Sequence, residues 1–194
     1  MTNSTAARED FVAAMRKVPT VVSVITSYVD GRPWGLTVSA FCSVSADPPT
    51  IMVSLGRHTR TLADVSLAGR FGVSLLSDTQ AHIAMLAGQP LQPKYIDMHT
   101  PEWHLGSSSE YGWHGFGEAG EENGIHDPVV PSVSNALCHL SCTVSQIITV
   151  ADHALVIGMV TDIAGPHADG PGPLLYHDRA FHQLGERIQP APPR

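Results

Sequence analysis

The chain has few cysteines, few basic residues and no long apolar run. Only 11 Lys and Arg stand against 18 Asp and Glu in 194 residues, a formal net charge of -7. This balance argues against a nucleic-acid partner, because binding a polyanion needs basic surface. A membrane-spanning helix needs about 20 apolar residues, so we expect no contact with a membrane. The N-terminus MTNSTAARED has no basic region followed by an apolar core, which favours a cytoplasmic location as the default.

Cysteine and histidine are present without the spacings that mark disulfide scaffolds or metal sites. Cys42, Cys138 and Cys142 form no CxxC pair, and an odd count is more typical of a reducing compartment. We therefore expect three buried thiols. Among the 11 histidines no pair has a close ligand spacing such as HxH or HExxH, so we expect no metal site.

The first third of the sequence predicts one helix followed by antiparallel strands. Residues 5–18 have helical apolar spacing, and "TVVSVITSYV" then changes to a β-branched pattern. Asp30-Gly31 predicts a hairpin leading to a strand that begins near Trp34. Pro48 and Pro49 predict a turn, because proline cannot donate to a strand ladder, and "TIMVSL" resumes as a strand.

The remaining periodic segments add two helices and further strands. A helical pattern ends at Gly69, "RFGVSLLS" is a strand, and a capping box of Ser77 and Gln80 opens a helix that ends at Gly88. "ALCHLSCTVSQIITV" and "ALVIGMVTDI" predict a hairpin, and "LLYHDRAFHQLG" predicts one last short strand. Many short strands with hairpin signals and two or three helices predict a mainly β fold with flanking helices, built as a small antiparallel barrel.

One long segment has no periodicity. It includes "GSSSEYGWHGFGEAGEENG", and a structureless stretch of this length is usually a binding loop or a disordered region. We expect a single domain over residues 1–194 with a Gly-rich loop insertion at about 97–131. The composition of the insertion is typical of a mobile surface loop.

The stretch "WGLTVSAFCSVSADPPTIMVSL" places small hydroxyl residues between two apolar runs. Small side chains leave a shallow polar surface where a flat ligand can approach the backbone. Backbone groups and hydroxyls can pair with the edge of a heteroaromatic ring, such as the pyrimidine side of a flavin. The residues that would form this surface are Gly35, Thr37, Ser39, Ala40, Ser43 and Ser45.

A cluster of positive charge and hydroxyls follows in "SLGRHTRT", just before a predicted helix. Helix N-termini and guanidinium groups both favour anions, so Ser54, Arg57, Thr59 and Arg60 predict a phosphate site beside the ring site. The alternative is that the hydroxyls line the solvent face of a strand and that the arginines are solvated.

The ordered set of motifs resembles the flavin reductase-like family, the small reductase components of two-component flavin monooxygenases. The motifs are "DGRPWGLTVSAFCSVSADPPTIMVSLGRHTRT", "GRFGVSLLSDTQ", "ADHALVIGMV" and "YHDRAFHQLG". The resemblance covers roughly residues 10–186 except about 97–131. It implies an FMN-binding split β-barrel, usually a homodimer with flavin at or near the subunit interface.

The resemblance also implies roles for particular residues. "LTVSAF" would lie along the isoalloxazine, with Thr37, Val38, Ser39, Ala40 and Ser43 beside the ring and with Ser45 and Asp47 in the adjoining turn. The ribityl phosphate would be held by Ser54, Arg57, Thr59 and Arg60. The nicotinamide side would be formed by His153, His177, Arg179 and His182, with His153 and His182 as the catalytic candidates. The sequence departs from the family at Val21, where members usually have glycine.

The function implied is that of an NAD(P)H-dependent flavin reductase delivering reduced FMN or FAD to a separate monooxygenase. Hydride would pass from nicotinamide C4 to flavin N5, with NADH or NADPH as donor. Two alternatives stay open. One is a flavoenzyme of the same fold that keeps its flavin and oxidises or oxygenates its own small substrate. The other is a non-catalytic flavin or tetrapyrrole binding module. Dependence of NADH consumption on added free flavin separates the three.

Overall fold

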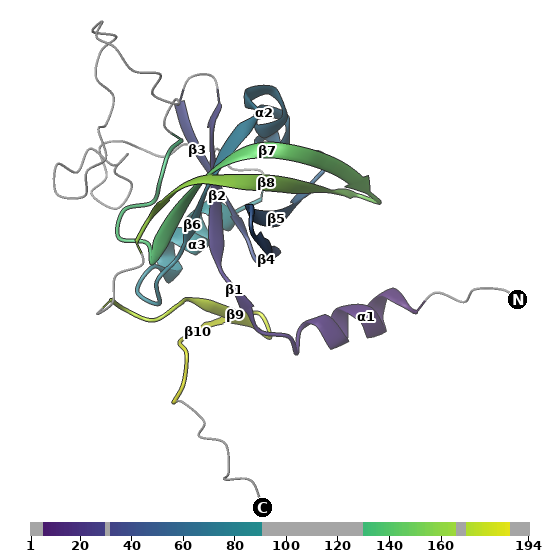
Figure 1. The fold of residues 1–194 in the computed structure, drawn as a ribbon. Coiled ribbons are helices and arrows are strands. Elements are labelled where there is room, and N and C mark those ends of the chain that lie inside the picture. Colours follow the sequence, from purple (N-terminus) through teal and green to yellow (C-terminus); the bar gives the residue numbers. More distant parts are fainter. Residues whose placement is uncertain (1–5, 30–31, 91–129, 166–169, 187–194) are drawn as a thin grey trace, which may run out of the picture.

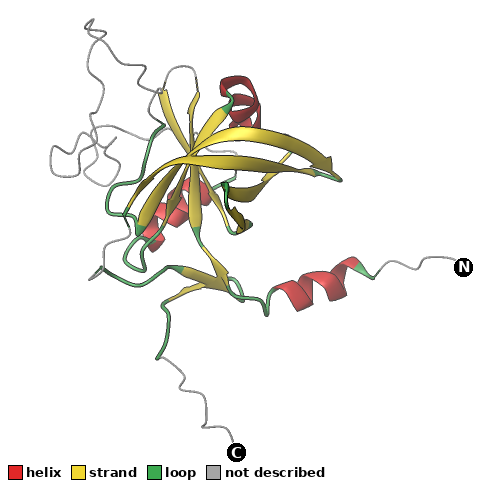
Figure 2. Ribbon diagram, viewed as in Figure 1, coloured by secondary structure: helices red, strands yellow, loops and turns green. Residues whose placement is uncertain are grey.

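Antiparallel strands dominate the computed structural model, which describes residues 6–29, 32–90, 130–165 and 170–186 (Figures 1 and 2). One sheet has the strand order β3-β2-β6-β7-β8-β5-β4, and a small sheet has the order β1-β9-β10. All pairings are antiparallel, which confirms the predicted mainly β fold with flanking helices. The elements are α1 (Arg8–Met15), β1 (Thr20–Val21), β2 (Ser23–Val29), β3 (Arg32–Val38), β4 (Phe41–Ala46), β5 (Pro49–Gly56), α2 (Arg60–Ala68), β6 (Arg70–Leu75), α3 (Ala81–Gly88), β7 (Cys138–Val150), β8 (His153–Ala164), β9 (Leu175–His177) and β10 (Ala180–His182).

The two end strands of the large sheet, β3 and β4, are neighbours in the sequence. Only Ser39 and Ala40 separate them, and the backbone N–H of Ser54 in β5 donates to the Ala40 carbonyl at 3.0 Å. The sheet therefore has to curl until its two ends meet, which makes it a barrel closed at Ser39 and Ala40. The sequence predicted one strand through this stretch. That prediction was wrong, because the chain changes its partner from β2 to β5 at these two residues.

Two apolar clusters fill the fold. One lies inside the barrel around Phe71, Val53 and Val156, with Val65 of α2 packed onto it. The other joins α3 to Val22, Leu76 and Leu174, residues that also link the small sheet to the barrel through backbone hydrogen bonds. Burial of these side chains is the main source of stability.

Tight hairpins connect the strands. Val29 pairs with Arg32, and the predicted Asp30-Gly31 turn between them lies outside the described residues. Val150 pairs with His153 in the predicted β7–β8 hairpin. The segment predicted as one last strand is instead the hairpin β9–β10, because the chain reverses between His177 and Ala180.

The helix boundaries agree with the sequence at some ends only. Gly69 ends α2 with φ +68°, a conformation that glycine adopts without strain. At the other predicted boundary, the N–H of Ser77 donates to Gln80 Oε1 at 3.0 Å, while Ser77 Oγ contacts Thr79 Oγ1 at 2.9 Å. Only half of the predicted capping box therefore forms. The first helix, α1, is shorter than residues 5–18 and buries none of its residues.

The three cysteines are free thiols with different exposure. Cys142 is buried, which raises its pKa to about 12, and Cys138 is half-buried. Cys42 lies exposed on β4, so the expectation of three buried thiols was wrong for this residue. Its side chain points away from the barrel interior, since its neighbour Phe41 packs against the core.

The predicted insertion at 97–131 falls almost entirely outside the described residues. Its last two residues, Val130 and Pro131, are buried, and Thr26 Oγ1 donates to the Pro131 carbonyl. Val130 and Pro131 are thus packed onto the barrel. Among the helices that the structure describes, none is long and apolar enough to cross a membrane.

Candidate functional site

A strip of small, exposed residues lies where the barrel closes. We call Ser39, Ala40 and Ser43 the closure strip; all three are exposed, and within the described chain the hydroxyls of Ser39 and Ser43 make no hydrogen bond. Two neighbours predicted to share this surface are used by the fold. Thr37 Oγ1 donates to the Ala84 carbonyl of α3 at 2.9 Å, and Val38 packs against the barrel core. The closure strip therefore retains the polar groups that a flat ligand needs.

The turn after the closure strip is shaped by Ser45. A register shift between Ser43 and Ser45 interrupts the β4–β5 pairing. Ser45 Oγ accepts from the N–H of Asp47 at 3.1 Å and donates to the Asp47 carbonyl at 3.0 Å. These bonds fix the backbone that leads into β5. Asp47 lies in the turn, whereas Ser45, predicted to share that turn, lies near the end of β4.

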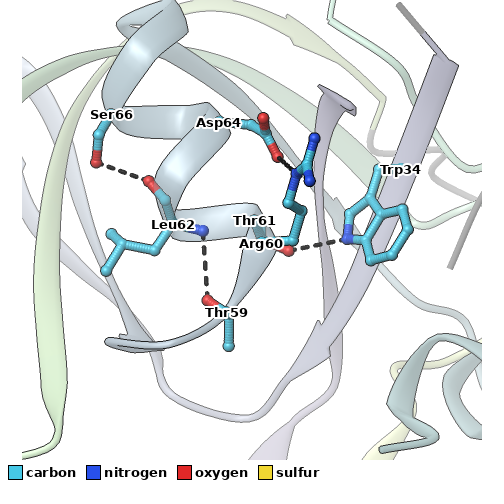
Figure 3. A network of polar contacts seen from close by, with 7 residues as sticks. All are labelled: Trp34, Thr59, Arg60, Thr61, Leu62, Asp64 and Ser66. Atoms are coloured by element: carbon cyan, nitrogen blue, oxygen red, sulfur yellow. Dashed lines mark hydrogen bonds and ion pairs between the residues drawn. The ribbon is translucent and has the colours of Figure 1, made fainter. Parts of the chain in front are cut away.

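The predicted phosphate residues run from β5 into α2: Ser54 lies in β5, Arg57 and Thr59 lie in the loop that follows, and Arg60 begins α2. Figure 3 shows Thr59 and Arg60. Thr59 caps α2, since its Oγ1 accepts from the N–H of Leu62 at 3.3 Å and donates to the Gly56 carbonyl at 2.8 Å. Arg60 lies one residue further, with Nε 3.5 Å from Asp64 Oδ2. Trp34 Nε1 donates to Thr61 Oγ1 at 3.1 Å, which ties the start of α2 to β3. The loop is therefore held in place on both sides.

Arg57 joins this loop to the β7–β8 turn. Its Nη1 donates to the Ala151 carbonyl at 3.2 Å, and its backbone N–H donates to the Asp152 carbonyl at 2.9 Å. His153 pairs with Gly56 in the sheet, and its Nδ1 lies 2.8 Å from Asp152 Oδ1. The hydrogen bond to His153 holds the pKa of the Asp152 carboxyl below its ordinary value. The structure thus places His153 beside the predicted phosphate residues.

Asp152 was missed by the sequence analysis. The sequence predicts a role for His153 only, although Asp152, an acidic residue directly before a candidate catalytic histidine, is a usable signal. A carboxylate can fix the orientation of an imidazole by accepting from Nδ1–H.

The β9–β10 hairpin carries the other predicted nicotinamide residues, His177, Arg179 and His182. The rings of His177 and His182 meet edge to face with centroids 5.6 Å apart, and His182 Nε2 lies 3.2 Å from the His177 carbonyl. Lys17 Nζ lies 3.0 Å from Asp178 Oδ2, and this bond lowers the pKa of Asp178. Figure 1 shows the hairpin beside the end of α1, away from the β7–β8 turn that carries His153.

The predicted residues therefore form two groups within one chain. The closure strip, the β5–α2 loop and His153 lie along β4, β5 and the β7–β8 turn, whereas His177, Arg179 and His182 lie on the small sheet. The first group offers hydroxyls that bond to no other described residue, together with exposed guanidinium groups, which fits a phosphorylated heteroaromatic ligand. No group of three potential metal ligands occurs among the described residues.

Comparison with known proteins agrees with this geometry. The model of the flavin reductase like domain family matches residues 15–185. A flavin reductase (NADH) of Kitasatospora aureofaciens is 30% identical over 174 residues, covering 89% of this chain and 80% of the relative. A flavin reductase (NADPH) of Lentzea aerocolonigenes is 30% identical over 173 residues, covering 89% and 87%. The structure of the styrene monooxygenase flavin reductase from Pseudomonas putida S12 superposes with a TM-score of 0.70 at 26% identity, covering 92% and 99%.

Proposed function

Because the chain belongs to the flavin reductase-like domain family, we propose that it is an NAD(P)H-dependent reductase that supplies reduced FMN or FAD to a separate monooxygenase. The observation that carries the proposal is the closure strip lying next to a loop with two exposed arginines. The names of the relatives support it, since they include NADH- and NADPH-dependent flavin reductases and the reductase of a monooxygenase.

The proposed roles of the residues follow from their positions. The flavin, when bound, would supply the acceptor for a hydride from nicotinamide C4, chemistry that needs two stacked planes and no protein nucleophile. Ser39, Ala40 and Ser43 orient the edge of the ring through hydroxyl and backbone groups, and Ser45 and Asp47 shape the turn beside it. Arg57, Arg60 and Ser54 hold the phosphate, while Thr59 caps α2 and sets the loop that presents the arginines. His177 and His182 lie on the proposed nicotinamide surface. His153 pairs with Gly56 at the start of the phosphate loop, and its catalytic role stays a prediction.

The first prediction concerns turnover. Purified protein should oxidise NADH or NADPH only when FMN or FAD is added. Flavin bound at the exposed closure strip should dissociate readily, so that it acts as a substrate. Steady-state absorbance at 340 nm, with and without flavin, measures this. Tightly bound flavin with no nicotinamide oxidation under any flavin supplement would replace the proposal with the flavoenzyme that keeps its flavin. No flavin binding at all would leave a tetrapyrrole-binding module as the alternative.

The second prediction tests the phosphate loop. Arg57→Ala removes a charge-assisted contact worth about 1.5–3 kcal/mol, so the dissociation constant for FMN should rise roughly ten- to a hundred-fold. Riboflavin lacks the phosphate and should bind wild type and variant almost equally. Fluorescence quenching titrations give all four constants. Equal losses for both ligands would indicate instead that Arg57 acts only by holding the β7–β8 turn through Ala151.

We also propose that the chain is one domain over residues 1–194, with its insertion at about 97–131, and that it forms a homodimer. Beyond Val144, β8 is the only strand in the described part of the chain that pairs with β7. The β7–β8 hairpin projects from the barrel (Figure 1), and its Ile147, Ile148 and Val150 are exposed. Exposed apolar strands of this kind are usually covered by another protein surface. Sedimentation equilibrium at micromolar concentration measures the assembly, and a monomer would contradict it.

A further inference from the structure

The turn of the β9–β10 hairpin places an arginine at a backbone position that favours glycine. His177 pairs with Ala180, so Asp178 and Arg179 form a two-residue turn, with φ of +46° and +68°. Turns with two positive φ values prefer Asn or Asp first and glycine second. Asp178 fits this preference and Arg179 does not. A residue with a Cβ is strained in this region, and such strain is often associated with function.

No interaction within the described chain accounts for Arg179. Its neighbour is well held, because Asp178 bonds to Lys17 Nζ at 3.0 Å and its backbone N–H donates to the Arg16 carbonyl at 3.0 Å. The side chain of Arg179 is exposed and makes no hydrogen bond or ion pair with any described residue. Its guanidinium therefore adds nothing to the stability of the fold, while its backbone conformation reduces it. The reason for an arginine here lies outside the fold.

The surroundings of Arg179 fit a nucleotide. In an acidic chain, Arg16 and Lys17 lie beside the same turn, and a guanidinium group binds phosphate through paired N–H donors. One face of the hairpin carries the edge-to-face rings of His177 and His182, and flat heteroaromatic rings of this kind stack on bases. An acidic protein surface would use the charge but not the rings.

We propose that Arg179 binds a phosphate group of the nicotinamide dinucleotide. The inference rests on the proposed function and names the residue by which this chain holds the hydride donor. Two phosphates of the donor share this chemistry. One is the diphosphate bridge that NADH and NADPH have in common, and the other is the 2′-phosphate that only NADPH carries.

Replacing Arg179 with glycine separates strain from binding. Arg179→Gly should raise the melting temperature by about 1–4 °C, since it relieves the strained turn. It should also raise the KM for the dinucleotide about ten-fold, with the KM for flavin unchanged. A rise in KM for both NADH and NADPH would indicate that Arg179 contacts the diphosphate, and a rise in KM for NADPH alone would indicate that it contacts the 2′-phosphate.

Two further variants serve as controls. Arg179→Lys keeps the strain and the charge, so it should leave the melting temperature unchanged and give an intermediate KM. Asn135→Gly changes another exposed residue with positive φ, +56°, and should leave both KM values unchanged. A more stable Arg179→Gly protein with both dinucleotide KM values unchanged would overturn the proposal, as binding of an acidic partner protein would give this result. A matching rise in the flavin KM would also overturn it, because it indicates general damage.

A binding measurement distinguishes this inference from the proposed function. If wild type oxidises neither dinucleotide with any flavin, the reductase function fails and the KM comparison with it. Calorimetry with ADP, which carries the diphosphate, and with adenosine 2′,5′-bisphosphate, which carries the 2′-phosphate, still tests Arg179. Binding of either nucleotide that weakens about ten-fold in Arg179→Gly supports a nucleotide phosphate site on the hairpin, and equal binding of both nucleotides to the two proteins overturns it.

Discussion

Replacing Gly72 with alanine should destabilise the fold by at least about 3 kcal/mol, among the largest effects of any single methyl group in this chain. Gly72 lies in β6, and a Cβ there would be 2.6 Å from His139 Cε1 and 2.8 Å from the Pro131 carbonyl oxygen, and would also clash with Thr26 Oγ1. Thr26 and His139 are buried and the carbonyl belongs to the backbone, so none of the three can move cheaply. Urea unfolding measures the loss.

Gly88→Ala is the matched control for this substitution. Gly88 ends α3, and a Cβ there meets nothing closer than Thr37 Cβ at 3.7 Å. The free energy of unfolding of the Gly88→Ala protein should differ from that of wild type by less than about 1 kcal/mol. Adding Thr26→Ala to Gly72→Ala removes one of the three clashes and should recover part of the loss. A Gly72→Ala protein as stable as wild type would show that the buried cluster around Pro131 is loosely packed.

Lowering the pH should destabilise the protein through His139. The His139 ring is buried, and its Nδ1 lies 2.9 Å from Ser74 Oγ, which also accepts from the N–H of Val133 at 3.0 Å. Burial lowers the pKa of His139 to about 4, from 6.5. Below pH 6.5 the unfolded chain takes up a proton that the folded chain does not accept until about pH 4. The contribution of His139 to the free energy of unfolding is therefore complete above pH 6.5 and is lost as the pH falls towards 4.

The size of this effect follows from proton linkage. Between pH 7 and pH 4.5 the free energy of unfolding should fall by about 2–3 kcal/mol through His139 alone. His139→Gln should lose this part of the pH dependence, although carboxylates still contribute to both proteins. His58→Gln, at an exposed position, should keep the wild-type profile. Chemical denaturation of the three proteins at the two pH values measures the difference, and parallel profiles for wild type and His139→Gln would rule out the role.

The sequence predicted correctly those elements whose local residue pattern and tertiary environment favour the same secondary structure. The β-branched run of β2 and the helix end at Gly69 were predictable, because periodicity and backbone preference both act over a few residues. The division of the next stretch into β3 and β4 at Ser39 and Ala40 was not predictable. Neither proline nor glycine separates β3 from β4, and the change of partner is decided by the closure of the whole barrel.

The site was predictable as a set of residue types more than as a set of contacts. The exposed serines of the closure strip and the arginines of the loop were named from the sequence. The hydrogen bond from Arg57 to the carbonyl of Ala151 could not be predicted, because any residue supplies a carbonyl and the two positions are far apart in the chain. The β9–β10 turn was missed for a similar reason, since Asp178 and Arg179 lack the glycine that signals a tight hairpin.

The short link between β3 and β4 also sets the order in which the barrel can assemble. Both β2–β3 and β4–β5 are hairpins formed from residues close in sequence, whereas β5 pairs with β8 over a long sequence separation. The β4–β5 hairpin therefore joins the rest of the sheet only when β5 meets β8, a contact of long sequence separation that forms slowly. Local opening of the native state would begin at the same edge. A ligand bound along the closure strip would hold the β4–β5 hairpin against the rest of the barrel, so that binding and completion of the barrel stabilise each other.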